Sequence, residues 1–294
     1  MIESLISFLA DLMPYLFPFD CMDAMFMRRA MLALLFIAPL TAISGIQVVN
    51  SRMSFFSDAI GHSAFAGVAL GLLCGLSLDL SMPLTAVLVG VIIMFLRRSS
   101  RLSSDTVIGV IFSAVAAAGL AIVARDRAAA GNIQMFLFGD ILTITEPQIA
   151  GMAGLLTLFL IFQFFAYNKL LLIGVNPMLA AVHRVNVRLY QYLFAILLAL
   201  VVIGSVRASG VILVTALLVV PAAAARNFAA SARSMFFLTL GIGYFSCISG
   251  LLLAAQEAVN IPAGSAIVLV AVLIFAISLI CNLLMPKRQS DSSL

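Results

Sequence analysis

Asp58 and His62 are the residues whose types and spacing point most directly to chemistry in this sequence. They stand four positions apart in the segment SDAIGHSAFAGVALG, where a long apolar stretch begins. A spacing of four places both side chains on one face of a helix. A carboxylate and an imidazole are suitable ligands for Mn²⁺, Fe²⁺ or Zn²⁺, so the pair is a candidate position for binding a divalent metal ion.

A structural role for the pair is the alternative. A carboxylate is favoured at the amino end of a helix, which it can cap, and a histidine inside a helical bundle can simply hydrogen-bond to a neighbour. Within a membrane, however, a charged side chain at the helix centre costs about 2.5–3.5 kcal/mol, and such a residue usually faces a partner or a water-filled path. Two ligands also do not complete a metal site, so the spacing alone leaves both interpretations open.

Small residues follow the pair at intervals of four: Ser63, Gly67, Gly71 and Gly75. Small residues at this spacing let two helices approach closely in lipid. We therefore predict that this ladder packs against another helix, and only secondarily that it forms the wall of a pathway.

The elements that must position these residues are membrane helices. The chain has 294 residues, of which 64% are hydrophobic and 10% charged, whereas a soluble domain carries roughly 25% charged residues. About 20 apolar residues span the hydrocarbon core as a helix. Nine charge-free runs of suitable length occur, at 30–51, 59–78, 80–96, 106–124, 147–168, 189–206, 208–225, 234–256 and 258–286. We predict an all-α, polytopic helical bundle with eight or nine spans, because helices satisfy their own backbone groups in lipid.

The remaining segments suggest how the chain is organised. Residues 1–28 contain no basic start typical of a secretory signal and are expected to lie at the membrane interface. Residues 29–285 form the transmembrane domain, and residues 286–294 a cytoplasmic tail. Two shorter apolar runs, 128–139 and 170–183, are predicted to be re-entrant, interfacial or loop-helix segments. Pro221 predicts a kink or an early helix end in the seventh run.

Basic residues predict the orientation. With nine spans and an extracytoplasmic amino end, eleven of the sixteen Lys and Arg residues lie on the cytoplasmic side and five on the other, as the positive-inside rule requires. The net charge of +4 is attributed to these flanks, and no nucleic-acid partner is expected. The four cysteines are scattered without CxxC spacing and are interpreted as small buried hydrophobes rather than disulfide partners.

The chain carries no recognisable energy source. Neither of its two lysines, Lys169 and Lys287, belongs to a GxxxxGK[ST] phosphate-binding loop, so we do not expect an enzyme that hydrolyses ATP. The segment that begins Asn176-Pro177 is typical of a helix start and predicts a short cytoplasmic helix. Such a helix is a suitable docking point for a separate ATPase, although the pattern fits a plain amphipathic connector equally well.

Five segments, taken in order, resemble the permease family of bacterial ABC importers for zinc, manganese and iron. The segment at 45–71 resembles the family's RRM-x-x-x-GDALSHA-x-x-G stretch, and GVILVTALLVVPAAAA at 210–225 resembles its G-x-LL-x-x-ALLV-x-PAA-x-A signature. The other three are SDTVIGVIFSAVAAAGLA at 104–121, FLFGDILTIT at 136–145 and PAGSAIVLV at 262–270. The resemblance covers nearly the whole chain.

The resemblance implies a multi-pass permease of the bacterial inner membrane that imports Mn²⁺, Zn²⁺ or Fe²⁺ as cargo and holds no tightly bound cofactor. It implies a cytoplasmic ATP-binding subunit, a second permease (identical or a paralogue) and an extracytoplasmic metal-binding protein as partners. Asp58 and His62 match the family's D-x-x-x-H on the translocation path. The stretch that contacts the ATPase corresponds to Asn176, Pro177, Met178, Ala181, His183 and Val185.

Two departures from the family pattern affect these expectations. The ATPase-contacting stretch usually begins Asp-Pro-Glu and has Gly at the position of His183, so no acidic coupling contact is expected at Met178. The spans after residue 190 contain no histidine, so one chain is not expected to supply four metal ligands.

Two other classes of function remain open on the residues alone. A gradient-driven secondary transporter would show broken helices in matching halves, and no internal repeat is evident. An intramembrane enzyme could use Asp58 and His62 as base and orienting group, but no nucleophilic Ser or Cys motif accompanies them.

Overall fold

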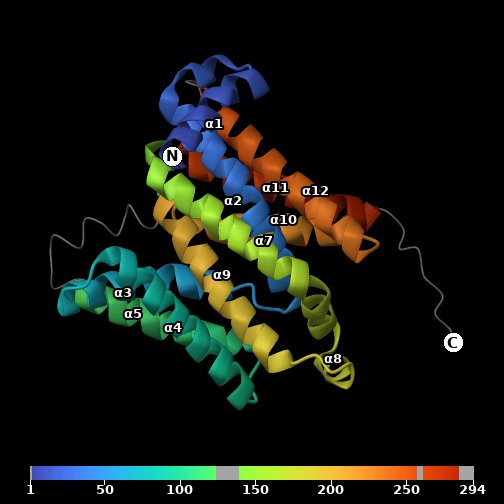
Figure 1. Ribbon diagram of the computed structural model, residues 1–294. Coiled ribbons are helices and arrows are strands. Elements are labelled where there is room, and N and C mark those ends of the chain that lie inside the picture. Colours follow the sequence, from blue (N-terminus) through green and yellow to red (C-terminus); the bar gives the residue numbers. More distant parts are fainter. Residues whose placement is uncertain (1, 124–138, 257–260, 285–294) are drawn as a thin grey trace.

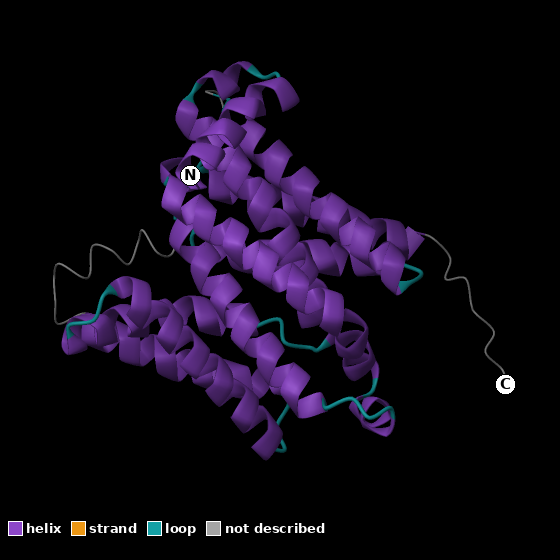
Figure 2. Cartoon of the chain, viewed as in Figure 1, coloured by secondary structure: helices purple, strands orange, loops and turns teal. Residues whose placement is uncertain are grey.

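The computed structural model describes residues 2–123, 139–256 and 261–284 and is built from helices. Among these residues no strand occurs, as Figure 2 shows. The long helices are α2 (Met25–Asn50), α3 (Phe56–Cys74), α4 (Leu78–Ser99), α5 (Ser104–Val123), α7 (Glu146–Val175), α9 (Val187–Ser209), α10 (Val211–Phe228), α11 (Ala232–Ala254) and α12 (Ala263–Leu284). The shorter elements are α1 (Ile2–Leu16), α8 (Pro177–Val182) and two 3₁₀ turns, η1 (Asp20–Asp23) and η2 (Ile141–Thr143).

Each of the nine predicted runs coincides with one long helix. Within the described residues, eight of these helices are long and apolar enough to cross a membrane. The predicted all-α membrane bundle is therefore confirmed.

The long helices form two groups that meet at α9 (Figure 1). On one side α3 packs against α4 and α5, and α4 packs along α9. On the other side α2 is the central helix, in contact with α7, α10 and α11, and α12 covers α10 and α11. One apolar core joins α3, α4, α9 and α10, and a second joins α1, the first half of α2, η2, α11 and α12.

Several hydroxyl groups within the spans satisfy their hydrogen bonds inside their own helix. Thr41, Ser44 and Thr85 each donate to the carbonyl oxygen four residues earlier, at 2.6 to 2.9 Å. In lipid no water is available for this purpose, so back-bonding lets a polar residue occupy an apolar span.

Several helices extend beyond the runs that predicted them, and α2 and α7 do so past charged residues. α2 begins at Met25, and its Arg28 and Arg29 pair with Asp11 and Glu146 at 3.2 and 2.5 Å. α7 continues through Lys169, whose ammonium group donates to the Tyr190 hydroxyl at 2.6 Å. Paired charges do not end a helix, because their cost is met by the partner.

The shorter predicted features have mixed outcomes. The run 170–183 is not a separate segment, since its first part completes α7 and only its second part forms the short helix α8. The early helix end predicted at Pro221 is wrong, because α10 runs through it to Phe228. The run 128–139 lies outside the described residues apart from Gly139.

The small-residue ladder packs mainly against α4, as predicted. A Cβ atom at Gly67 would lie 2.8 Å from the Cα of Met82, and one at Gly71 would lie 2.7 Å from the Ser81 hydroxyl. Gly75 has another role, since its φ of 68° ends α3 in the left-handed conformation.

Candidate functional site

α3 presents Asp58 and His62 as half-buried side chains in its first two turns. The N-cap of α3 is Phe55, and no side chain caps this end. The alternative in which Asp58 caps the helix is therefore wrong, although the carboxylate still lies in the first turn, where the helix dipole favours negative charge.

Asp58 faces α10. Thr215 of α10 is the residue of that helix that lies beside the Asp58 carboxyl group, and the Thr215 hydroxyl donates to the carbonyl oxygen of Ile212 at 3.3 Å. α10 can reach this position because α3 has a glycine there: a Cβ atom at Gly61 would lie 2.7 Å from Cγ1 of Val211. The close approach of the two helices thus sets the carboxylate opposite a hydroxyl.

His62 faces α5. Its imidazole ring makes edge contacts with Phe112 of α5, at 4.9 Å between ring centroids, and with Phe65 of its own helix, at 5.6 Å. α5 approaches closely here as well, since a Cβ atom at Gly119 would lie 2.8 Å from the backbone nitrogen of Ala66. The two candidate ligands therefore lie on the side of α3 that α5 and α10 flank.

One chain offers only part of a metal site at this position. Within the described residues no group of three or more His, Cys, Asp or Glu side chains is arranged to hold a metal ion. Asp58 and His62, with the Thr215 hydroxyl, supply at most three donors of the oxygen and nitrogen type that Mn²⁺ and Zn²⁺ accept.

The cysteines provide no further ligands. All four are free, and only Cys247 is buried. Cys74 is exposed and Cys21 and Cys281 are half-buried, so the interpretation as buried hydrophobes is correct for Cys247 alone. Burial raises the pKa of the Cys21 thiol in η1 above its ordinary value, so this thiol stays protonated at neutral pH.

The predicted ATPase-docking stretch forms a separate, well-capped helix. The Asn176 side chain accepts hydrogen bonds from the backbone N–H groups of Met178 and Leu179, at 2.9 and 3.2 Å, and Pro177 is the first residue of α8. Met178, Ala181 and His183 are exposed, and Val185 is half-buried in the turn that leads to α9. α8 is thus a fixed projection at the end of α7 (Figure 1).

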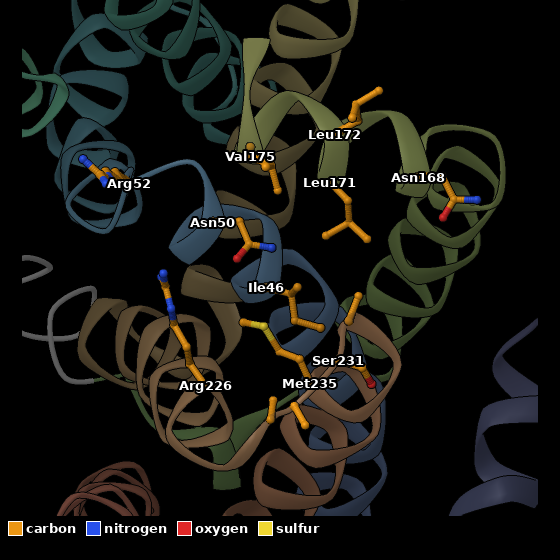
Figure 3. Close-up of a pocket in the computed structure, with 14 residues that line it drawn as sticks. Ile46, Asn50, Arg52, Asn168, Leu171, Leu172, Val175, Arg226, Ser231 and Met235 are labelled. Atoms are coloured by element: carbon orange, nitrogen blue, oxygen red, sulfur yellow. The ribbon is translucent and has the colours of Figure 1, made fainter. Parts of the chain in front are cut away.

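A cavity of about 710 Å³ opens beside this end of α7. It lies between the carboxyl ends of α2, α7 and α10 and the amino end of α11. Figure 3 shows Arg52, Asn50 and Arg226 on one side of it and Asn168 on the other. Among the described residues, its lining contains two arginines and no acidic residue.

Some polar groups at these sites were not predicted from the sequence. Thr215 could have been noticed as the one hydroxyl residue in the run 211–225, whereas nothing distinguishes Phe112 from other apolar residues of its helix. Gln47 and Gln163 are buried in α2 and α7 without a hydrogen-bond partner for their side chains, and the sequence gives no sign of this.

Comparison with known proteins identifies the family. The model of the ABC 3 transport family matches residues 23–282. The chain belongs to this family. The manganese import system permease protein ScaB of Streptococcus gordonii is 32% identical over 258 residues, which cover 87% of this chain and 91% of that protein. The high-affinity zinc uptake system membrane protein ZnuB of Haemophilus influenzae is 30% identical over 252 residues, covering 85% and 95%.

A solved structure agrees with the assignment to the ABC 3 transport family. PsaBC from Streptococcus pneumoniae, in complex with Fab, superposes with a TM-score of 0.74 at 28% identity, and the match covers 93% of this chain and 95% of that chain. Together with the eight apolar helices, these relatives confirm a multi-pass permease of the bacterial inner membrane.

Proposed function

We propose that this ABC 3 permease imports a divalent transition metal ion, Mn²⁺, Zn²⁺ or Fe²⁺, and that Asp58 and His62 contact the ion on its path. The observation that carries this proposal is the half-buried carboxylate and imidazole on the side of α3 between α5 and α10. The names of relatives from two organisms, one a manganese and one a zinc permease, support the same class of cargo.

The geometry suits transient rather than permanent binding. Three ligand groups from one chain leave part of the coordination sphere to water or to a second permease. A site that holds the ion weakly can release it to the cytoplasm, whereas a closed site of four strong ligands would retain it. The carboxylate partly neutralises the charge of the ion inside a low-dielectric bundle.

The energy is proposed to come from a separate cytoplasmic ATP-binding subunit. α8, with Asn176, Pro177, Met178, Ala181, His183 and Val185, is its proposed contact, because this short capped helix projects from the end of α7 with its apolar side chains exposed. An extracytoplasmic metal-binding protein is proposed to deliver the ion to the opposite face. A gradient-driven transporter is the competing function, and it requires no such subunits.

Uptake of radiolabelled Mn²⁺, Zn²⁺ and Fe²⁺ by metal-starved cells tests the proposed path. Strains would carry the wild-type permease, Asp58→Asn, His62→Gln, or Ser113→Ala as a control on the exposed part of α5. We expect both site variants to lose most uptake of one metal while the control keeps it. Unchanged uptake in the Asp58→Asn/His62→Gln double variant, at equal protein level in the membrane, would exclude these residues from the path.

A further inference from the structure

Two helices at the cytoplasmic end of the protein finish with the same backbone motif. After α2, the N–H of Arg52 donates to the carbonyl oxygen of Val49 and the N–H of Met53 to that of Val48, at 3.3 and 3.0 Å. After α8, the N–H of Arg184 donates to Ala181 and that of Val185 to Ala180, both at 3.0 Å. Both endings are Schellman caps, which require one residue in the left-handed conformation.

Arginine occupies the left-handed position in both caps. Arg52 has a φ of 53° and Arg184 a φ of 59°, and they are the only residues other than glycine with positive φ in the part of the chain described. The Schellman cap at the carboxyl end of α3 has Gly75 at the corresponding position, with a φ of 68°. Glycine adopts this conformation without the clash that a Cβ atom causes, so each arginine carries a conformational cost.

Hydrogen bonds and ion pairs do not offset this cost in the part of the chain that the structure describes. Both arginines are exposed, and neither side chain has a hydrogen bond or ion pair within the residues that the structure describes. A positive charge near a helix carboxyl end interacts favourably with the helix dipole. A basic residue one position earlier would have the same interaction without leaving the helical conformation, so the dipole does not explain the left-handed arginines. Strain of this kind at an exposed side chain points to a function outside the chain.

The surroundings of the two caps indicate what meets them. Arg52 lines the 710 Å³ cavity together with Arg226 and Val175, and α2 ends beside α7, since a Cβ atom at Gly174 would lie 3.3 Å from that of Asn50. Arg184 follows α8. An apolar patch lies next to it, made of Val175 at the end of α7 and Met178 and Val182 of α8, which are each at least 80% exposed. An apolar patch with a charged rim is typical of a protein–protein interface.

We propose that Arg52 and Arg184 are rigid cationic contacts for acidic side chains of the cytoplasmic ATP-binding subunit, one on each side of the exposed apolar patch. The Schellman caps fix the backbone from which each guanidinium projects. A guanidinium forms two parallel hydrogen bonds to a carboxylate, so this arrangement sets the register of the subunit relative to α8. The inference rests on the proposed ATP-driven function; it adds Arg184 to the residues of the expected docking stretch and Arg52 as a contact outside that stretch.

Glycine substitution separates the two roles of these arginines. Arg52→Gly/Arg184→Gly removes both charges and places in each cap the residue that the cap prefers. We expect this variant to unfold at the same temperature as the wild type or higher. We also expect it to bind the ATP-binding subunit about three- to thirtyfold more weakly, since each exposed ion pair contributes a modest amount.

The measurement is the affinity of the permease, in nanodiscs of neutral lipid, for its purified ATP-binding subunit as salt is raised. Arg101→Gln, in the exposed loop between α4 and α5, removes one charge from the same side of the membrane as a control. The inference is supported if the double glycine variant binds weakly with a flatter salt dependence, if Arg52→Lys/Arg184→Lys recovers part of the affinity, and if Arg101→Gln binds as wild type does.

Three results would overturn it. Equal affinity of the double glycine variant and the wild type would mean that the arginines do not meet the subunit. A loss of affinity seen only in nanodiscs with anionic lipid would assign the arginines to lipid phosphates. If the wild type binds no ATP-binding subunit and imports metal without ATP, the proposed function fails and the inference fails with it.

Discussion

Replacing Gly67 by alanine tests how tightly α3 must approach α4 to hold the candidate site. The added methyl group would lie 2.8 Å from the Cα of Met82 and 3.4 Å from its backbone nitrogen, whereas ordinary van der Waals contacts begin at about 3.4 Å. Because these neighbours are backbone atoms, the helices must move apart by about half an ångström along their contact. Such overpacking typically costs 1–3 kcal/mol.

Gly241 provides the matched control. It also lies inside a long helix, α11, but a Cβ atom there would meet nothing within 4 Å. Alanine is favoured over glycine within a helix by about 1 kcal/mol, and this gain applies to both sites. We therefore expect Gly241→Ala to raise the free energy of unfolding by up to about 1 kcal/mol and Gly67→Ala to fall about 1–3 kcal/mol below it.

Unfolding of the two purified variants by SDS in mixed micelles, followed by circular dichroism, measures this difference. Metal uptake by Gly67→Ala should fall as well, because a shift of α3 displaces Asp58 from Thr215. If the two variants unfold at the same SDS fraction, the close α3–α4 contact does not exist as described.

Three further predictions concern single contacts. Glu146→Gln removes the ion pair with Arg29 that joins α7 to α2. Because both side chains are partly exposed, we expect the free energy of unfolding to fall by only about 1 kcal/mol. The difference in unfolding temperature between this variant and the wild type should become smaller at high salt. Cys74 is exposed at the end of α3 that the orientation assigns to the outside, so a membrane-impermeant maleimide should label it in intact cells when the other cysteines are serine; labelling only after lysis would reverse the orientation. Phe112→Ala uncovers one edge of His62 and should speed its modification by diethylpyrocarbonate severalfold, with the exposed histidine after α8 as reference; an unchanged rate would show that the ring contact does not shield the imidazole.

The number and order of the long helices follow from the sequence, and their ends do not. Charge-free length decides which segments can enter lipid, so each predicted run became a helix. The predicted helix ends are wrong where a charged residue has a partner on another helix. Arg29 of α2 pairs with Glu146, and Lys169 of α7 hydrogen-bonds to Tyr190. Partners so distant in sequence become visible only when the bundle is assembled.

Only the part of the candidate site that lies on α3 itself could be predicted from the sequence. Spacing of four predicts Asp58 and His62 on one side of a helix, and both residues belong to α3. Their neighbours Thr215 and Phe112 belong to other helices, whose approach depends on Gly61 and on Gly119. The arginine caps likewise depend on backbone conformation that no local pattern in the sequence indicates.

The most direct test is ATP-dependent metal uptake by proteoliposomes that contain only the purified permease and the two proposed partners, the ATP-binding subunit and the metal-binding protein. We predict accumulation of one divalent metal when ATP is supplied on the side of α8, none with a non-hydrolysable analogue, and none with Asp58→Asn/His62→Gln in place of the wild type. Accumulation without ATP, driven by an ion gradient alone, would contradict the account and identify a secondary transporter.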